Sequence, residues 1–475
     1  MEFHFQFHFG LEPYVAIVLY LAMIVAFLGS VFRSSTIGIY FLLPLIPLQT
    51  IRYRLAEYPL GASVVGVILL GVILGLLREG KPIFRKTPFT GIIVVYGAFT
   101  FFSLCLGSFS IDRPLPLPGD PRWGVWQDYM MMPALLLIVA AVAPDKRQLQ
   151  IMILVMCLAT LSLNKNFWNT ISDRDFSSYS DDLRDEGGMG YAGTNGLAAF
   201  EAQSAALLLA LASFEKKPWP RLAYRALAVF SAVCLMYSLS RGGYVAFFAG
   251  WVVLGLLHER KLLALLIVFL FTWTAVAPPA VRERVMMTYD EQHQSVDNST
   301  ATRFSLWENA MQVFQSNPLT GSGFNTYAYM HLNKRTDGGS GFYEDTHNYY
   351  IKVLAETGIV GLLIFLALLM QMLGVGFRLF RTAEDPFLAS IGLGLVGWLV
   401  CSIVANFFGD RWTFLQVNGY LWVLGGMASQ ALALEKEAAE RALEPESQSV
   451  RMETTKEEVQ PEAETVVQPP LAALY

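Results

Sequence analysis

Three basic residues with apolar neighbours are the first candidates for chemistry in this chain. One of them, Arg241, lies between Ser240 and a pair of glycines, where two long apolar runs meet. An unpaired guanidinium inside a membrane costs roughly 2.5–3.5 kcal/mol, so Arg241 is expected to face a polar cavity or an anion. A guanidinium can hold a phosphate group with two parallel hydrogen bonds, and the glycines would let such a ligand approach the backbone closely.

The second arginine opens a predicted helix inside a long polar segment, residues 278–347. Thr302 is a suitable N-cap, which would place Arg303 in the first helical turn. A helix start already favours anions, so Arg303 would add a cation to a phosphate site. Apolar side chains at helical spacing give this helix one apolar face, formed by Phe304, Trp307, Met311 and Phe314.

His347 ends the same polar segment, and an apolar run follows directly. The ordinary pKa of imidazole, about 6.5, suits a general base that takes a proton from a hydroxyl group. Most histidines in polar loops are simply solvated, but this one stands beside a helix start at an expected membrane surface. We therefore predict that His347 is a base and that Arg241 and Arg303 bind an anionic group.

The elements that must position these residues are membrane-spanning helices. Of the 475 residues, 54% are hydrophobic and 15% are charged, and the mean hydropathy is +0.43, which is too apolar for a soluble enzyme. The apolar runs are continuous, so the expected fold is an all-α polytopic membrane protein and not a β-barrel. We expect a bundle of about 12–13 spanning helices of roughly 20 residues each. Their expected ranges are 14–32, 36–50, 60–77, 89–106, 125–143, 147–164, 193–214, 221–239, 242–257, 261–277, 348–376, 386–408 and 412–433.

The second of these runs is short and contains Pro44 and Pro47. It is therefore expected to be kinked or re-entrant. The N-terminus lies outside if all the runs cross the membrane, and inside if this one does not.

Lysine and arginine in the short loops predict the orientation. Two basic clusters should be cytoplasmic: Arg78, Lys81, Arg85 and Lys86, and Lys216, Lys217, Arg221 and Arg225. Counting helices between them places the loops at 107–124, 165–192, 240–242, 278–347 and 409–411 on the outer side. The acidic tail, with ten acidic and four basic side chains in residues 434–464, should be cytoplasmic and disordered.

This pattern divides the chain into four regions. Residues 1–277 form N-terminal transmembrane helices, and residues 278–347 form one large outer loop that contains short helices and two of the predicted catalytic residues, Arg303 and His347. Residues 348–433 form C-terminal transmembrane helices, and residues 434–475 form the tail.

Several short motifs follow one another in order between residues 180 and 410. They are Arg184, Asn195 within residues 193–198, Ser240-Arg241-Gly242-Gly243, Thr302-Arg303 with Trp307, Asn317-Pro318-Leu319 with Gly321 and Gly323, His347-Asn348, and Glu356-Thr357-Gly358-Ile359-Val360-Gly361. The ordered set resembles the O-antigen ligase and O-antigen polymerase superfamily. No single motif is specific, but their order is.

The resemblance implies an enzyme of the bacterial inner membrane whose active site faces the periplasm. Its donor would be a glycan on undecaprenyl diphosphate, and its acceptor a glycan, lipid A core or protein. Membrane lipids would surround it, and no cofactor, metal or nucleic acid would take part. The catalytic positions would be His347, Arg241 and Arg303. Substrate-binding positions would be Arg184, Asn195, Asn348, Asp410 and Arg411.

Three alternatives stay open at this point. A polymerase that joins repeat units would use the same chemistry as a ligase that transfers a finished chain. A polysaccharide transporter would show repeats and broken helices with charges near the membrane midplane. A metal-dependent lipid-linked glycosyltransferase would use loop carboxylates. The available ones are Asp112, Asp120, Asp181, Asp182, Asp185 and Glu186.

Overall fold

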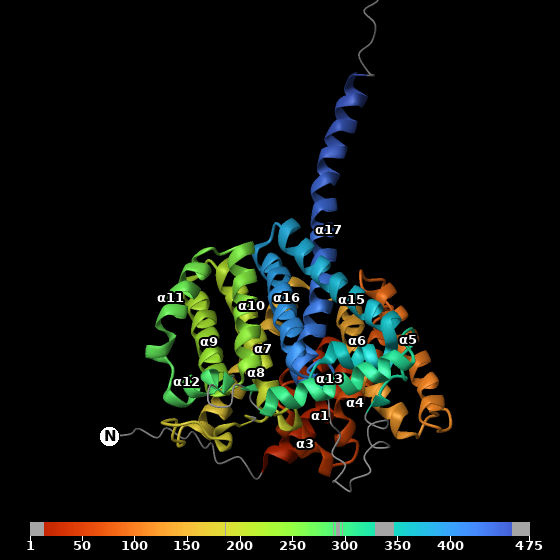
Figure 1. Ribbon diagram of the computed structural model, residues 1–475. Coiled ribbons are helices and arrows are strands. Elements are labelled where there is room, and N and C mark those ends of the chain that lie inside the picture. Colours follow the sequence, from red (N-terminus) through yellow and green to blue (C-terminus); the bar gives the residue numbers. More distant parts are fainter. Residues whose placement is uncertain are drawn as a thin grey trace, which may run out of the picture.

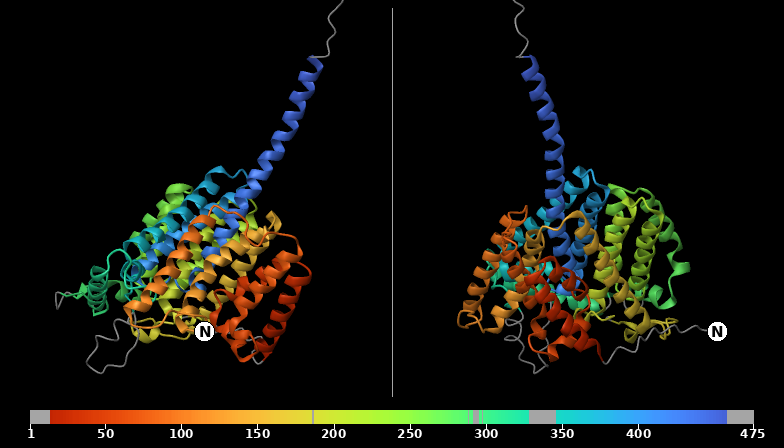
Figure 2. Two further views of the ribbon diagram at one scale, coloured as in Figure 1. Left: turned by 90° about the vertical axis from the view of Figure 1, so that its right-hand side faces the viewer. Right: turned by 180° about the vertical axis from the view of Figure 1, so that it is seen from behind.

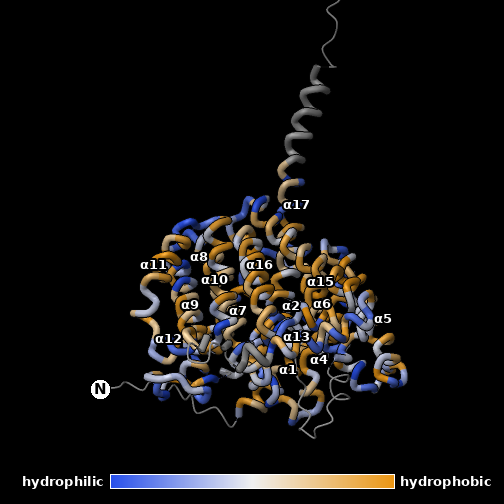
Figure 3. Tube along the Cα trace, viewed as in Figure 1, coloured by the Kyte–Doolittle hydropathy of each residue, from blue (hydrophilic) through white to orange (hydrophobic). Residues whose placement is uncertain are grey.

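The protein is an all-α bundle in the computed structural model, as the apolar runs predicted (Figure 1). The structure describes residues 14–185, 187–287, 289–290, 295–296, 298–327 and 346–457. The residues outside the described part are therefore 1–13, 186, 288, 291–294, 297, 328–345 and 458–475. Hydropathy along the trace shows apolar helices between two more polar ends (Figure 3).

Each of the thirteen predicted runs is helical. The N-terminal half contains α1 (Val15–Phe32), α2 (Thr36–Leu45), α3 (Gln49–Tyr53), α4 (Val64–Arg78), α5 (Thr90–Ser110), α6 (Pro121–Val142), α7 (Lys146–Ile171) and α8 (Gly193–Phe214), with short 3-10 turns η2 (Arg54–Glu57), η3 (Gly61–Ser63), η4 (Asp181–Leu183) and η5 (Gly190–Ala192). The C-terminal half contains α9 (Pro218–Tyr237), α10 (Arg241–Leu257), α11 (Lys261–Val276), α12 (Pro279–Met286), α13 (Asn298–Ser316), α15 (Tyr349–Thr382), α16 (Pro386–Ala405), η6 (Asn406–Phe408) and α17 (Leu415–Glu457), with a small hairpin of β1 (Tyr289–Asp290) and β2 (Ser295–Val296).

Fewer of these helices satisfy the length and hydropathy of a membrane span on their own. Among the described residues, eight are long and apolar enough, or nine if α11 and α12, which meet at a bend of 113°, count as one span. The second run is short, as predicted, because α2 ends at Leu45 before Pro47. The chain is thus a multi-pass membrane protein, although length and composition alone support fewer spans than the predicted 12–13.

The helices alternate in direction between two ends of the bundle. At one end Ser35 donates to Glu79 and Lys81 donates to the carbonyl of Val142, so parts of the predicted cytoplasmic surface meet there. At the other end the backbone of Thr50 donates to Gly188. Helices α12 and α13 also lie at this second end, whereas α17 leaves the bundle at the first (Figures 1 and 2). The start of α1 lies at the end with the long loop.

Helix α15 is broken at Gly358, and this break controls the position of the long loop. Gly358 has φ 64° and ψ −168°, a conformation that is essentially restricted to glycine. The break frees backbone groups on both sides, and residues 318–323 of the loop pair with them. Ser322 and Gly323 donate to the carbonyls of Ala355 and Glu356 at 3.0 and 2.7 Å. On the other side, the N–H groups of residues 359 and 360 donate to the carbonyls of residues 318 and 319.

The loop therefore enters the bundle instead of lying entirely outside it. The backbone N–H of Phe324 donates to the carbonyl of Ser103 on α5 at 3.2 Å. A Cβ on Gly323 would stand 2.1 Å from the Cα of Gly107, so this contact requires glycine. The sequence predicted the motif residues at this crossing but not that they join two helices.

The predicted start of the loop helix was wrong by five residues, since the N-cap was expected at Thr302. Helix α13 begins at Asn298, so Arg303 lies in its second turn, where the N-terminal backbone groups are already paired. Its predicted apolar face was also partly wrong. Leu306 and Ala310 are buried, whereas Phe304 is 54% exposed. The buried face follows from packing against Ala355 of α15, which the helix pattern alone did not contain.

The tail prediction was wrong as well for residues 434–457. They continue α17 as a helix that leaves the bundle (Figure 1). Alanine, glutamate, lysine and arginine are strong helix formers, so a high charge does not by itself prevent a helix. Ion pairs one turn apart support it, at 3.5 Å for both Lys436–Glu440 and Glu437–Arg441.

The break in α15 gives a prediction about stability. Gly358→Ala should destabilise the protein by about 1–3 kcal/mol, because alanine is strained at this φ and ψ. The added Cβ would also stand 2.3 Å from the carbonyl oxygen of Leu319. Thermal unfolding of purified protein in detergent measures the change. Gly66→Ala on α4 is the control, since a Cβ there meets nothing within 4 Å. Equal melting temperatures for the two variants would contradict the strained break.

Candidate active site

The turn between α9 and α10 places Arg241 at a helix start. Leu239 is fully buried and has φ 56°, a left-handed conformation that reverses the chain at this point. Ser240 then caps α10 by accepting a hydrogen bond from the N–H of Gly243 at 3.4 Å. Arg241 is the first residue of α10 and lies at the end of the bundle that carries the long loop.

Two predicted substrate-binding residues are joined to this turn. Asn195 in the first turn of α8 accepts hydrogen bonds at its side-chain oxygen from Arg184 at 3.0 Å and from Ser240 at 2.8 Å. Asn195 thus fixes the cap of α10 and the guanidinium of Arg184 with one atom. The structure thus brings these residues together, and their role with a substrate stays a prediction.

A third arginine, Arg284 on α12, joins this group. Burial lowers the pKa of the Arg284 guanidinium, and the nearby positive charges of Arg241 and Arg184 lower it further. The guanidinium lies over the ring of Tyr179, 4.8 Å from its centroid. Sequence reasoning missed Arg284, because only the bend between α11 and α12 brings it back over the bundle.

These three arginines are held at one place by a small apolar cluster. Each lies within three residues of a member of that cluster along the chain, so its side chain is anchored by a nearby buried neighbour. The members are Leu183, Leu239, Ala277, Ala280 and Val281. We call Arg184, Arg241 and Arg284 the arginine cluster.

The arginine cluster contains buried hydrogen-bond donors that the described residues do not satisfy. The Nε atoms of Arg184 and Arg284 are both buried and have no hydrogen-bond partner among the described residues. Leaving a buried charged donor unpaired is costly. An anion between these guanidinium groups would satisfy the donors and reduce the mutual repulsion of the positive charges.

The candidate site has two parts, the arginine cluster and the region around His347. His347 lies immediately before α15. It has φ 51° and an exposed side chain. The following residue, Asn348, is 6% exposed and caps α15 by accepting from the N–H groups of Tyr350 and Ile351 at 3.0 and 3.2 Å. The structure therefore gives Asn348 a positioning role, and its predicted substrate contact stays a prediction.

Helix α13 is fastened beside His347. The indole Nε1 of Trp307 donates to the carbonyl of Thr346 at 2.9 Å. Trp307 follows Arg303 by about one helical turn. The structure thus joins the helix of Arg303 to the residue that precedes His347, as expected if both face one site.

The loop at residues 409–411 connects the two halves. Asp410 is 4% exposed, and its carboxylate pairs with Lys352 on α15 at 2.7 Å. Phe408, two residues before Asp410, packs against Gly242 at the start of α10. A Cβ added to Gly242 would stand 2.8 Å from the Cβ of Phe408. The backbone of Arg411 is held from the core by Asn406 and Asn418. Asp410 thus ties this loop to α15, and Phe408 ties it to α10. The contact of Asp410 and Arg411 with a substrate stays a prediction.

Two of the loop carboxylates that a metal-dependent enzyme could use already have structural partners. Asp120 caps α6 and pairs with Arg122 at 2.6 Å, and Asp185 pairs with Arg174 at 2.5 Å. Within the described ranges there is no group of three or more histidine, cysteine, aspartate or glutamate residues that could hold a metal ion. The described carboxylates thus give that alternative no ready ligand set.

Comparison with protein families bears on the identity of the chain. Residues 226–366 match a family described as O-antigen ligase, so this part of the chain confirms the resemblance seen in the motifs. The matched segment contains Arg241, Arg284, Arg303, His347 and the break at Gly358. A search of curated proteins found no match. The family supports glycan transfer of the ligase or polymerase type, with a lipid-linked glycan and an acceptor as its general partners.

The arginine cluster predicts tight binding of a diphosphate. Arg284→Ala should weaken binding of a polyprenyl diphosphate by about 10- to 100-fold, because a charge-assisted hydrogen bond is lost. Titration of protein in nanodiscs with the labelled lipid measures this change. Arg282→Ala is the matched control, since Arg282 is exposed on the same helix and donates to the carbonyl of Thr274. Similar lipid affinities for both variants would show that Arg284 does not bind the diphosphate.

Proposed function

We propose that the protein is an inverting, metal-independent glycosyltransferase that moves a glycan from undecaprenyl diphosphate to an acceptor hydroxyl. The reaction would take place at the periplasmic face of the bacterial inner membrane. The observation that carries the proposal is the arginine cluster, which gathers three guanidinium groups where spanning helices meet the long loop. A lipid diphosphate matches both surroundings, because its tail is apolar and its head is anionic.

The arginine cluster would bind the diphosphate and stabilise it as it leaves. Negative charge grows on the phosphate oxygen as the bond to the anomeric carbon breaks. Guanidinium groups that are fixed before the reaction stabilise this charge without reorganisation. The buried Nε atoms of Arg184 and Arg284, which lack partners among the described residues, supply two donors for it. Arg303 on α13 would approach from the loop.

His347 would act as the base in a single displacement. The acceptor oxygen bonds to the anomeric carbon while the carbon–oxygen bond to the phosphate breaks. The hydroxyl proton passes to the imidazole of His347, and undecaprenyl diphosphate leaves with the electron pair. One displacement inverts the anomeric carbon. The exposed side chain of His347 and its fixed place before α15 support this role.

A ligase and a polymerase share this chemistry and differ only in the acceptor. The family match supports both. We favour transfer to an acceptor other than a growing lipid-linked chain, the ligase reaction, with the polymerase reaction as the alternative. Deleting the gene separates them, because single repeats on lipid accumulate without a polymerase and long chains on lipid accumulate without a ligase.

The base assignment predicts that His347 acts on turnover and not on binding. His347→Asn should lower the transfer rate by about 10²–10⁴-fold, while the polyprenyl diphosphate still binds with wild-type affinity. Asparagine tolerates the left-handed backbone at this position, so the variant should fold. Transfer assays in nanodiscs and lipid titrations measure the two quantities.

The pH dependence and a second variant complete this test. The wild-type rate should rise with pH, because only the neutral imidazole accepts a proton, and the rise should disappear in His347→Asn. His258→Asn, at the opposite end of the bundle, is the control and should keep the wild-type profile. A His347→Asn enzyme with normal turnover, or one that loses lipid binding together with activity, would exclude His347 as the base.

The proposal also predicts that no divalent ion is required. Arginine side chains would neutralise the diphosphate in the way that Mg²⁺ does in other transferases. Purified protein should therefore keep its rate in excess EDTA. Loss of activity in EDTA, with recovery on adding Mg²⁺ or Mn²⁺, would instead support the metal-dependent class.

A further inference from the structure

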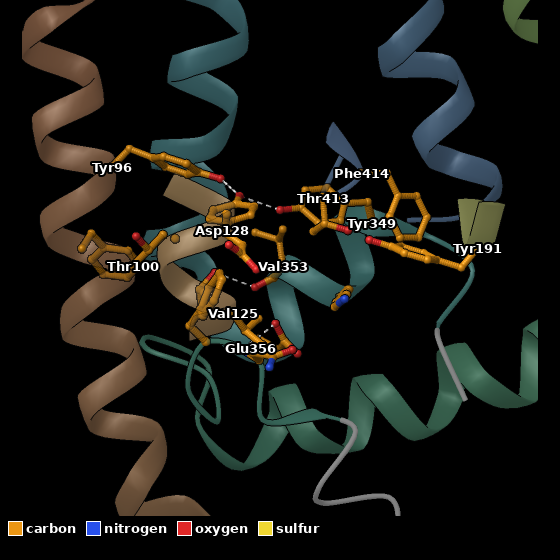
Figure 4. A pocket seen from close by; sticks show the side chains of 17 residues that line it. Tyr96, Thr100, Val125, Asp128, Tyr191, Tyr349, Val353, Glu356, Thr413 and Phe414 are labelled. Carbon is orange, nitrogen blue, oxygen red and sulfur yellow. Dashed lines mark hydrogen bonds between the residues drawn. The ribbon is translucent and has the colours of Figure 1, made fainter. Parts of the chain in front are cut away.

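A cavity of about 230 Å³ lies beside the candidate site and has no role in the proposal so far (Figure 4). Helices α5, α6 and α15 surround it, together with the loop residues that follow α13 and the start of α17. It is smaller than the roughly 300–1,000 Å³ of pockets for drug-sized ligands, so it has room for about one ring-sized group.

One face of α15 connects this cavity with the predicted base. Tyr349, Lys352, Val353 and Glu356 all line the cavity, and their spacing places them on a single side of the helix. His347 comes two residues before the first of them. A group that enters the cavity therefore lies along the same helix end that holds the imidazole.

The cavity also communicates with the arginine cluster through a short series of contacts. Lys352 lines the cavity and pairs with Asp410 at 2.7 Å. The 3-10 turn just before Asp410 packs on Gly242 through Phe408, next to Arg241. A donor whose diphosphate binds at the arginine cluster would not occupy this cavity. The cavity would then be open to the second substrate, the acceptor.

The lining combines aromatic rings with polar groups. Tyr191 and Phe414 pack edge to face with ring centroids 5.7 Å apart, and Tyr129 packs against Phe324 at 5.1 Å. The hydroxyl of Tyr129 is hydrogen-bonded to that of Tyr349 at 2.7 Å. Aromatic rings of this kind offer large flat apolar faces with polar tips.

Two carboxylates at the cavity differ in how they are used. Glu356 is 5% exposed and accepts from the backbone N–H groups of Asn325 and Tyr327 at 3.0 and 3.3 Å, so it holds the loop in place. Asp128 on α6 lines the cavity with an exposed side chain and accepts no hydrogen bond from the residues that the structure describes. The positive charge of Arg52 acts on this carboxylate, but the Asp128 oxygens can still accept hydrogen bonds from a ligand.

We propose that this cavity binds a sugar ring of the acceptor glycan. A sugar has an apolar C–H face, which an aromatic ring can cover, and a hydroxyl edge, which a carboxylate can accept hydrogen bonds from. Phe414 and Tyr191 supply the first kind of surface and Asp128 the second. Neutral sugar hydroxyls fit the cavity better than a second diphosphate, because Asp128 and Glu356 are acidic and the lysine in the lining, Lys352, already pairs with Asp410. This inference rests on the proposed function, since it assigns the cavity to that reaction's acceptor.

The test compares two ligands on the same set of purified proteins in nanodiscs. The lipid probe is undecaprenyl diphosphate. The sugar probes are two oligosaccharides released by mild acid from the cell's own surface, one from the repeat-unit glycan and one from the lipid A core. The proteins are wild type, Arg241→Ala, Asp128→Asn, Phe414→Ala and the control Glu308→Gln, which removes a carboxylate at an exposed position on α13.

The two kinds of variant should show opposite effects. Asp128→Asn and Phe414→Ala should each weaken binding of one oligosaccharide by about tenfold and leave lipid binding unchanged, because each loses one contact to the sugar. Arg241→Ala should lose the lipid and keep the sugar, and Glu308→Gln should keep both. The oligosaccharide that binds identifies the source of the acceptor.

Several results would overturn the assignment. Wild-type protein that binds neither oligosaccharide, or cavity variants that bind sugar within twofold of wild type, would show that the cavity is not an acceptor site. Cavity variants that lose both ligands and melt at lower temperature would show that the cavity lining is structural. If Arg241→Ala keeps the lipid while the cavity variants lose the sugar, the diphosphate proposal fails and the cavity remains a sugar site.

Discussion

The arrangement of the site depends on the hydrogen bonds across the break in α15. A backbone group without a partner is very unfavourable inside a membrane, so a broken helix there needs another chain segment to pair with it. Residues 318–323 supply that pairing on both sides of Gly358. This contact fixes the end of α13 against the bundle. Trp307 then links α13 to Thr346, which places Arg303 and His347 in one region.

Much of the fold could be predicted because spanning helices are encoded locally. Each apolar run contains enough hydrophobic residues to define a helix without knowledge of its neighbours. Arg241 could be identified in the same way, since a charge between two such runs needs a special explanation. The motif at residues 356–361 was visible as a pattern, but its meaning as a helix break needed the loop that pairs with it.

What could not be predicted depends on contacts between distant residues. Arg284 joins Arg184 and Arg241 only because α12 bends back and buries Ala280 and Val281 with Leu183 and Leu239. The pairing of the buried Asp410 carboxylate with Lys352 could not be read from the sequence either, because the two residues are far apart along the chain. The continuation of α17 was missed for another reason. Net charge was weighed above helix propensity, although the tail is rich in alanine and glutamate.

The break in α15 also bears on whether the chain could be a transporter. Transporters use broken helices because the freed backbone groups bind ions or substrate at the membrane midplane. Here the freed carbonyls of Ala355 and Glu356 and the N–H groups of Ile359 and Val360 all pair with the loop. They are therefore occupied and cannot serve as ligands unless the loop leaves. The break functions as an attachment point for residues 318–323, and such an attachment favours a fixed active site over an alternating-access pathway.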